Sequence, residues 1–533
     1  MSWNQYPRPA LKRDSYFCLN GTWELATEEE QYNQTVEVPS CVEDRGQVLW
    51  YRRYFTLPKD FIKNRVLLHF GAVDQIARVF LNGRFVGIHE GGYLPFTFDV
   101  TAFLQAENVL TVEVKDCLED KRLPYGKQTY KRGGMWYTPV SGIWQTVWME
   151  SVPEAYIQGL QIKNGLDWVE ISVSGVAQGL VEVDGMAPVS LEKGRCRITI
   201  PNPRNWSPED PYLYNFVIRA GEDRIQSYFA LRTVEIKEVD GYPRICLNGK
   251  PYFFHGLLDQ GYWQEGIFTP GSPEAFDQDI LFAKSLGFNM LRKHIKIEPA
   301  LFYYACDRLG MIVFQDMVNN GRYSFLRDTA LPTIGMRYLP DRWLHRNKKR
   351  REAFEQAMEE TVNVLGHCPC ICYWTIFNEG WGQFCGTQMY KRLKALDDSR
   401  VIDTASGWFS GVASDVDSRH VYFRKVRLKA GKKPLVLSEF GGYSYKVEGH
   451  VYNPRKEYGY GKCTTRGDFV ASLRKLYLEE IVPLVPKGLC AAVYTQISDV
   501  EDEINGLITY DRQVEKVKPE EFSDVGFTLR GLS

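Results

Sequence analysis

The sequence predicts a multidomain protein with an N-terminal jelly-roll β-sandwich, residues 1–151, an immunoglobulin-like β-sandwich, 152–238, and a C-terminal (β/α)8 TIM barrel, 239–533. Two observations predict this order. Up to about residue 240, short apolar runs are separated by turn residues and show no helical periodicity. Beyond it, short apolar strands alternate with amphipathic helices. A chain of 533 residues has room for two to four domains of about 150 residues.

The first domain is predicted from β-branched and aromatic runs that alternate with Gly, Asn and Asp turn signals. The clearest runs cover residues 65–70, 77–83, 108–116 and 145–151. Asn82-Gly83 is typical of a tight hairpin, because both residues tolerate the positive φ angles of a primed turn. We therefore expect antiparallel strands in a sandwich of the jelly-roll type.

The second domain is predicted from a smaller set of strand-like runs, at residues 169–175, 196–202, 213–220 and 226–236. The segment has no helical periodicity and is close to the roughly 100 residues of an immunoglobulin-like sandwich.

The third domain is predicted from eight apolar strands that alternate with helices, the rhythm of a TIM barrel. The expected strands are 251–258, 288–293, 311–316, 370–379, 401–405, 420–423, 434–440 and 489–496. The expected helices lie near 274–286, 298–308, 350–365, 385–396 and 467–481. Only 60 residues (439 − 379) separate the ends of the fourth and seventh strands, where three average units would need roughly 93. The helices after the fifth and sixth strands should therefore be short or missing.

Composition excludes some partners. Lys plus Arg number 65 and Asp plus Glu 66, a net charge of −1, so a nucleic acid or an anionic membrane would lack its usual electrostatic attraction. Aromatic residues make up 14% of the chain. They fit either stacking on sugar faces or packing in large β cores, and composition alone leaves both open.

The N-terminal residues contain no apolar run and no small-residue cleavage site, so we expect no secretory signal. The sequence contains no run of about 18 consecutive apolar residues, so we expect no transmembrane helix. The 12 cysteines are scattered except for Cys368, Cys370 and Cys372, which we expect to share one strand face as buried thiols. A second ligand cluster with zinc-like spacing is missing, so no metal site is predicted. These features favour a reduced, cytoplasmic protein.

Two strands of the predicted barrel end in a carboxylate. Glu379 follows the fourth strand, and Glu439 closes the seventh. In TIM barrels the catalytic groups lie at the carboxyl ends of the strands. Two carboxylates about 5–5.5 Å apart allow glycoside hydrolysis, in which one attacks the anomeric carbon and the other protonates the leaving oxygen. The alternative is a helix N-cap for Glu379 and a structural ion pair for Glu439.

Further polar and aromatic side chains are expected on the same rim. Arg292 would hold a carboxylate nucleophile ionised, and Tyr422 would donate a hydrogen bond to it. Taken singly, such residues are more often packing or ion-pair elements, so their convergence carries the prediction. The full set is Arg292, His294, Asp316, Asp403, Trp408, His420, Tyr422, Tyr494 and Gln496.

These motifs resemble glycoside hydrolase family 2, which includes β-galactosidases, β-glucuronidases and β-mannosidases. FNEGW (377–381) and LSEFGG (437–442) match its acid/base and nucleophile motifs. The segments TPVSGIWQTVWME (138–150) and WSPEDPYLY (206–214) resemble its two N-terminal β domains. The resemblance implies an exo-acting, retaining enzyme with Glu379 as acid/base, Glu439 as nucleophile and Asn378 bound to the sugar 2-hydroxyl.

The sequence does not settle the sugar. The Asn-x-Lys pair that grips a sugar carboxylate in family β-glucuronidases is missing after the eighth strand. Asn347-Lys348-Lys349 has the spacing, but we expect it to be the start of a helix. We therefore expect a β-galactosidase-like enzyme acting on a small oligosaccharide or glycoside. The alternatives are a β-glucuronidase, β-mannosidase, galactofuranosidase or α-L-arabinosidase, or a non-catalytic carbohydrate-binding protein.

No cofactor is implied, and the metal sites of large family β-galactosidases cannot be mapped onto this chain. The last expected strand has Tyr494 where the family often has Trp. The long Arg322–Arg350 segment is expected to shape the aglycone side; the alternative is a loop that serves packing alone. Jelly-roll loops at 89–93 and 116–128 are expected to reach the rim, with Asp116 completing the sugar site; the alternative is ordinary solvent-facing turns. A homo-oligomer is compatible with the sequence.

Overall fold

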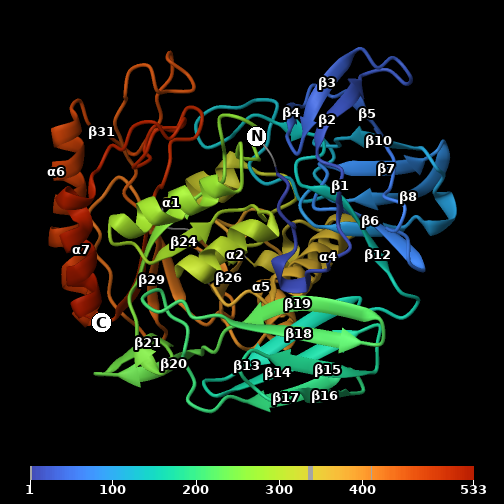
Figure 1. Cartoon of the computed structure of the whole chain (residues 1–533). Helices are drawn as coiled ribbons and strands as arrows, with labels where there is room; N and C mark the ends of the chain where they lie inside the picture. Colours follow the sequence, from blue (N-terminus) through green and yellow to red (C-terminus); the bar gives the residue numbers. More distant parts are fainter. Residues whose placement is uncertain (1–2, 334–339, 410, 533) are drawn as a thin grey trace.

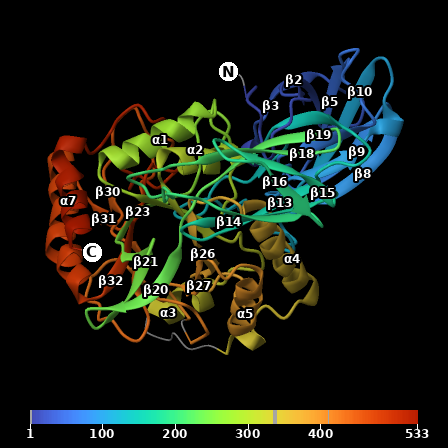
Figure 2. The same cartoon turned by 60° about the horizontal axis from the view of Figure 1, so that its bottom comes forward.

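The jelly roll and the immunoglobulin-like domain pack on one side of a barrel whose far side carries α6 and α7 (Figures 1 and 2). The computed structural model describes residues 3–333, 340–409 and 411–532. The predicted fold class is confirmed. Within the described residues, no helix is long and apolar enough to cross a membrane.

The jelly roll is a sandwich of two antiparallel sheets, ordered β1-β12-β6-β9 and β3-β2-β5-β10-β7-β8. Apolar side chains from both sheets fill one core. Asn82 and Gly83 have φ of 54° and 75° between β7 and β8, which confirms the predicted hairpin turn. The strands are β1 (Phe17–Cys18), β2 (Gly21–Ala26), β3 (Gln34–Val38), β4 (Val42–Glu43), β5 (Val48–Phe55), β6 (Arg65–Phe70), β7 (Ile76–Leu81), β8 (Arg84–Glu90), β9 (Phe96–Asp99), β10 (Asn108–Lys115), β11 (Val140–Ser141) and β12 (Val147–Val152).

The immunoglobulin-like domain is one antiparallel ladder, β13-β14-β17-β16-β15-β18-β19, that folds over a shared core. A single residue pair, Glu192 with Arg195, joins β16 to β17, so the ladder bends there into two layers. Its strands are β13 (Gly159–Asn164), β14 (Trp168–Ser174), β15 (Gln178–Val183), β16 (Val189–Glu192), β17 (Arg195–Thr199), β18 (Tyr214–Ala220) and β19 (Asp223–Phe229). A small sheet of β20 (Val234–Val239), β21 (Tyr242–Leu247) and β22 (Lys250–Pro251) leads into the barrel.

The described residues of the barrel contain eight parallel strands in the order β27-β26-β25-β24-β23-β32-β29-β28. The two end strands meet through a 3.3 Å contact between the hydroxyls of Ser406 and Ser418. The strands are β23 (Phe254–Asp259), β24 (Met290–Lys293), β25 (Ile312–Asp316), β26 (Ile371–Asn378), β27 (Val401–Ser406), β28 (Asp417–Val421), β29 (Leu435–Phe440) and β32 (Leu489–Tyr494). A short pair, β30 (Tyr443–Ser444) and β31 (Gly461–Lys462), follows β29.

The helices match the sequence prediction closely. They are α1 (Glu274–Ser285), α2 (Ala300–Leu309), α3 (Leu331–Thr333), α4 (Lys348–Leu365), α5 (Gly386–Leu396), α6 (Arg466–Leu476) and α7 (Pro519–Gly531). Within the described residues no helix lies between β27 and β29, as the 60-residue spacing predicts. Asn347 caps the N-terminus of α4, so the Asn347-Lys348-Lys349 run is the start of a helix.

Two local predictions are wrong. The sixth strand ends at Val421 rather than at Phe423, because Phe423 takes a left-handed φ of 57° and is 80% exposed. Cys368 and Cys370 precede β26 instead of lying in it, since Pro369 between them has no N–H for the ladder. The twelve cysteines all lie in the described residues and are unpaired.

Buried ion pairs and hydrogen bonds hold the domains against one another. Arg13 is 4% exposed and bridges Glu150 of the jelly roll, 2.8 Å away, and Asp223 of the immunoglobulin-like domain, 2.9 Å away. Arg232 donates to the carbonyls of Pro369 and Ile371 at 2.8 and 2.6 Å, which fixes the immunoglobulin-like domain on the barrel. These contacts hold the jelly roll beside the barrel.

Candidate active site

The two predicted carboxylates meet at the carboxyl end of the barrel. Oxygens of Glu379 and Glu439 lie within 4.8 Å of each other, with His420 between them. Glu379 follows β26 in a left-handed conformation with φ of 50°, which is uncommon outside glycine and typical of functional sites. The side chains of Glu379 and Glu439 keep 13% and 7% exposure, so both remain reachable.

Glu439 is held as a carboxylate by its neighbours. Tyr422 donates to its Oε2 at 2.6 Å, and Arg292 Nη1 lies 3.0 Å from its Oε1. Burial by itself raises the pKa of Glu439, but His420, Arg292 and His294 outweigh it and lower this pKa to about 2. The roles expected for Arg292 and Tyr422 toward this carboxylate match their geometry.

The guanidinium of Arg292 organises three neighbours at once. Its Nη2 donates to Oδ1 of Asn378 at 2.9 Å, which leaves the amide NH₂ of Asn378 free to face a substrate. Its Nε donates to Oδ1 of Asp316 at 3.0 Å, and His294 Nδ1 lies 2.7 Å from Oδ2. Both oxygens of Asp316 are therefore used, and the residue is 1% exposed. We expected Asp316 to bind substrate, but it positions Arg292 and His294 instead.

Glu379 is oriented by His420. Nδ1 of His420 lies 2.8 Å from Oε1 of Glu379, and its Nε2 lies 3.1 Å from the hydroxyl of Ser406. The ring of Trp408 lies 6.0 Å from the His420 ring, and its indole Nε1 has no hydrogen-bond partner in the described part of the chain. Trp408 and His420 are thus placed beside the predicted acid/base.

Removing the Tyr422 hydroxyl should move the acid limb of the pH–rate profile. Wild-type Glu439, with its pKa lowered to about 2, stays ionised above about pH 3. A hydrogen bond to a charged group contributes about 1.5–3 kcal/mol, so Tyr422→Phe should raise the pKa of Glu439 by about one to two units. Because the ionised form reacts, kcat/KM should fall at higher pH than in wild type. The exposed Tyr54, as Tyr54→Phe, is the control. An unchanged acid limb would contradict this role.

At the eighth strand, the structure corrects the prediction for Tyr494 and refines the prediction for Gln496. Tyr494 is fully buried, packs against Phe440 and Tyr477, and accepts a hydrogen bond from the Tyr443 backbone. It belongs to the barrel wall, because alternate residues of a strand face opposite sides. Gln496 lies past the strand end, where its Nε2 donates a hydrogen bond to Oε2 of Glu503 at 2.8 Å.

Three residues that the sequence reasoning missed lie beside these groups. Thr495 contacts the Tyr422 hydroxyl at 3.0 Å. The ring of Tyr460 stacks on Tyr422 with centroids 3.9 Å apart. Glu503 accepts a hydrogen bond from Gln496 at 2.8 Å, and burial, with a smaller contribution from the charge of Glu439, raises its pKa. Thr495 and Glu503 could have been found by their position in the sequence. Both follow the last strand, and the active sites of TIM barrels lie at the carboxyl ends of the strands.

Asp116 is not placed among the catalytic side chains. It is 8% exposed, and the groups whose charges act on it, Asp44 and Lys121, belong to the jelly roll. Burial and the charge of Asp44 raise the pKa of Asp116 to about 7. The expectation that it completes the sugar site is not supported, because Asp116 directly follows β10 and stays within the sandwich.

The rest of that jelly-roll segment does reach the barrel rim. Tyr125 donates its N–H to Asn319 O at 3.1 Å and its hydroxyl to Gly321 O at 2.9 Å. Thr138 donates its N–H to Glu501 at 2.7 Å. Gly126 has φ of 66°, and a Cβ there would come within 2.9 Å of the Tyr93 hydroxyl, so the close turn requires glycine. Lys127 follows it, and its Nζ lies 5.7 Å from the ring centroid of Trp381, two residues after Glu379.

The loop at 89–93 supports this turn instead of lining the site. It lines a separate cavity of about 250 Å³ beside α4, and the Tyr93 hydroxyl accepts from Gln128 at 3.3 Å.

Part of the Arg322–Arg350 segment packs beside the predicted acid/base. Tyr323 packs edge-on against Trp381 at 5.7 Å, and Trp136 of the jelly roll stacks on Trp381 at 5.2 Å. These three rings form an aromatic wall beside Glu379; burial, with a smaller contribution from the charge of Glu379, raises the pKa of Tyr323. Residues 334–339 of this segment lie outside the described part of the chain.

The donors of Glu379, His420 and Glu439 are close enough together, within 4.8 Å, to be considered as cation ligands. The guanidinium of Arg292 already lies 3.0 Å from Glu439 and would repel a cation there. The Tyr422 and His420 contacts occupy further carboxylate oxygens. The donor set fits a pair of hydrogen-bonded catalytic carboxylates better than a metal site.

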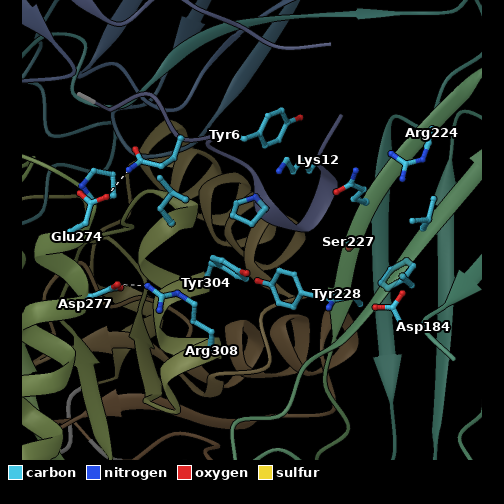
Figure 3. A pocket seen from close by; sticks show the side chains of 18 residues that line it. Tyr6, Lys12, Asp184, Arg224, Ser227, Tyr228, Glu274, Asp277, Tyr304 and Arg308 are labelled. Atoms are coloured by element: carbon cyan, nitrogen blue, oxygen red, sulfur yellow. Dashed lines mark hydrogen bonds and ion pairs between the residues drawn. The ribbon is translucent and has the colours of Figure 1, made fainter. Parts of the chain in front are cut away.

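A cavity of about 680 Å³ lies elsewhere, between the N-terminal segment, the immunoglobulin-like domain and helices α1 and α2 (Figure 3). Polar side chains of its lining bind one another: Arg308 pairs with Asp277, and Gln5 donates a hydrogen bond to Glu274. None of the catalytic candidates lines it.

Relatives of this chain carry two different activities in their names. A β-galactosidase from Thermoanaerobacter pseudethanolicus is 30% identical over 308 residues, covering 52% of this chain and 40% of that protein. A β-glucuronidase from Felis catus is 25% identical over 478 residues, covering 74% of this chain and 69% of that protein. The chain thus spans less than half of the length of the bacterial β-galactosidase.

Solved structures share the fold over nearly the whole chain. A β-D-glucuronidase from Dictyoglomus thermophilum superimposes with a TM-score of 0.74 at 17% identity, covering 98% of both chains. A β-galacturonidase from Eisenbergiella tayi bound to galacturonate gives 0.72 at 19% identity, covering 99% of both chains. At these identities the likeness shows the fold alone.

Family models match all three domains. The sugar binding domain of glycosyl hydrolases family 2 matches residues 11–153, a second family 2 model matches 160–232, and the family 2 TIM barrel domain matches 236–516. The barrel model alone covers more than half of the chain, so this protein belongs to glycosyl hydrolase family 2.

Proposed function

We propose that this protein is a retaining exo-β-glycosidase that releases a terminal sugar by double displacement. The observation that carries the proposal is the separation of the two carboxylates, with oxygens within 4.8 Å. Retaining enzymes hold their carboxyl groups about 5–5.5 Å apart, whereas inverting enzymes need about 6.5–9.5 Å to admit a water molecule.

In the first step Glu439 attacks the anomeric carbon while Glu379 protonates the leaving oxygen. Glu439 suits the nucleophile because Arg292 and Tyr422 keep it ionised and aim its oxygens. Glu379 suits the acid because, among the described residues, it has no Lys or Arg partner and its carboxylate contacts the imidazole of His420. Asn378 would donate its free NH₂ to the sugar 2-hydroxyl, since Arg292 occupies its carbonyl oxygen.

In the second step Glu379 removes a proton from water, which attacks the glycosyl-enzyme from the face that the leaving group occupied. The sugar is then released with its original configuration. The jelly-roll segment that docks on the rim supports exo action, because it limits how far a chain can extend across the barrel.

We also propose which terminal sugar the enzyme releases. β-Galactosidase-like specificity is supported by the missing Asn-x-Lys pair and by a bacterial relative with that name. A uronidase is the second candidate, because relatives of similar fold carry that activity in their names.

A panel of aryl glycosides tests the proposal. We expect turnover of at least one aryl β-galactoside, mannoside, glucuronide or galactofuranoside, or of an α-L-arabinoside. Proton NMR during early turnover should show the product anomer with the configuration of the substrate. An inverted first product would contradict double displacement. Sugar binding without turnover of any substrate would indicate a non-catalytic carbohydrate-binding protein.

A further inference from the structure

Two oppositely charged side chains from different domains lie beside the catalytic carboxylates and take no part in the steps above. Lys127 belongs to the jelly-roll segment and is 8% exposed. Glu503 belongs to the loop after β32 and is 2% exposed. Buried charges are costly unless they are paired, so each needs a partner.

Lys127 has no such partner in the described residues. No carboxylate oxygen there lies within 4.0 Å of its Nζ, which contacts only the faces of Tyr137 and Trp381, at 5.6 and 5.7 Å from the ring centroids. Nζ has no hydrogen-bond partner among the described residues and is not one of their fully buried unpartnered atoms, so it keeps some exposed surface. Trp381 follows Glu379 by two residues, so its contact with Nζ places Lys127 beside the catalytic groups; burial and the charge of Lys127 also lower the pKa of His294 to about 4.

Glu503 is fixed by polar neighbours and has no ion pair within 4.0 Å among the described residues. Its Oε2 accepts from Gln496 at 2.8 Å and from Gln260 at 3.4 Å, and Tyr137 also donates a hydrogen bond to this carboxylate. Gln260 contacts the Tyr137 hydroxyl as well, and the Tyr137 ring lies 5.6 Å from Nζ of Lys127, so the two charged side chains are neighbours. Burial raises the pKa of Glu503 to about 7; Lys127 opposes this shift and Glu439 adds to it.

The two charges face one site but are separated by more than 4.0 Å. A hydroxyl group accepts from an ammonium and donates to a carboxylate, and so joins groups about 5–6 Å apart. Two neighbouring hydroxyls of a sugar ring supply the same acceptor and donor.

We infer that Lys127 and Glu503 together bind hydroxyl groups of a neutral terminal sugar, and that Glu503 discriminates against uronic acids. The inference rests on the proposed function and narrows its substrate class.

The charge balance of the site supports this preference. Arg292 already faces two carboxylates, Asp316 and Glu439, and Lys127 faces Glu503. A sugar carboxylate would add a further negative charge beside Glu503 and Glu439, which Lys127 could not offset together, and desolvating it would be costly. A hydroxyl carries no such cost. Because the pKa of Glu503 is raised to about 7, this discrimination applies above about pH 7, where Glu503 is ionised, and the comparison is made there.

The test compares kcat/KM for neutral aryl glycosides and aryl uronides in wild type, Lys127→Met, Glu503→Gln and the double variant. The matched control is Lys131→Met, an exposed lysine of the same segment. Losing one hydrogen bond to a charged group should lower kcat/KM for the neutral substrate about 10- to 100-fold in each single variant. The double variant should lose less than the product of the two single losses, because both residues hold the same hydroxyls.

For aryl uronides we expect relative activity to change in the opposite direction. Wild type should prefer the neutral sugar by at least about 100-fold, and Glu503→Gln should raise relative activity on uronides about tenfold, because it removes a repulsive charge. The inference is overturned if wild type prefers uronides and Lys127→Met abolishes that activity, since Lys127 would then bind the sugar carboxylate. It is also overturned if neither variant changes kcat/KM while melting temperatures match wild type.

Failure of the proposed function can be told apart. If wild type turns over no glycoside, titration calorimetry of the free sugars with wild type and the Lys127→Met variant decides the inference alone. Binding of a neutral sugar, weakened by Lys127→Met and absent for uronic acids, supports it. Tighter binding of a uronic acid, or equal affinity in the variant, overturns it.

Discussion

Glu439→Gln should lower kcat by at least about 10⁴-fold on every substrate, including those with activated leaving groups. The amide is too weak a nucleophile to form the glycosyl-enzyme, and Arg292 and Tyr422 would still hold it in place. The fold should persist, because the change keeps the size of a side chain that is 7% exposed.

Mass spectrometry gives the sharper measurement. A 2-deoxy-2-fluoro glycoside should add one sugar mass to the wild-type peptide that contains Glu439 and none to the variant. The control is Glu448→Gln, whose side chain is 80% exposed and lies outside the site. A variant with near-wild-type kcat, or a label on another residue, would show that Glu439 is not the nucleophile.

Glu379→Ala should slow hydrolysis according to the leaving group. Loss of a general acid costs about 10²–10⁴-fold for alkyl glycosides and poor aryl leaving groups, which depend on protonation. Dinitrophenyl glycosides should still form the glycosyl-enzyme, which then accumulates because no base activates water. The measurement is a plot of log kcat/KM against leaving-group pKa, steeper for the variant than for wild type.

Azide separates the two glutamates. In Glu379→Ala the small anion can enter the space of the lost carboxylate and attack the glycosyl-enzyme, so turnover recovers and the product is the β-glycosyl azide. In Glu439→Ala azide would attack from the opposite face and give the α-glycosyl azide. The same anomer from both variants would overturn the assignment of roles.

Much of the barrel could be predicted because its signals are local. Each buried strand is an apolar run bounded by turn residues, and the residue that ends it falls on the catalytic rim whatever the surrounding packing. Glu379 and Glu439 are therefore visible in the sequence, and the 60-residue spacing between them also predicted the missing helices.

Side-chain direction and pairing could not be read in this way. Tyr494 ends a strand like Glu439, yet it packs into the wall against Tyr477. Asp316 ends a strand too, but Arg292 and His294 use both of its oxygens. Such outcomes depend on which face of the strand a residue occupies and on partners from distant strands.

The sequence by itself determined the family, the order of the three domains and the two carboxylates, because apolar runs and motif residues act over a few positions. Only the tertiary structure decided which charges share the site. Lys127 and Glu503 are separated by 376 residues (503 − 127), and only the docking of the jelly roll on the barrel rim brings them together. Burial then makes their pairing important, because a charge removed from water must find its partner within the fold or in a bound substrate.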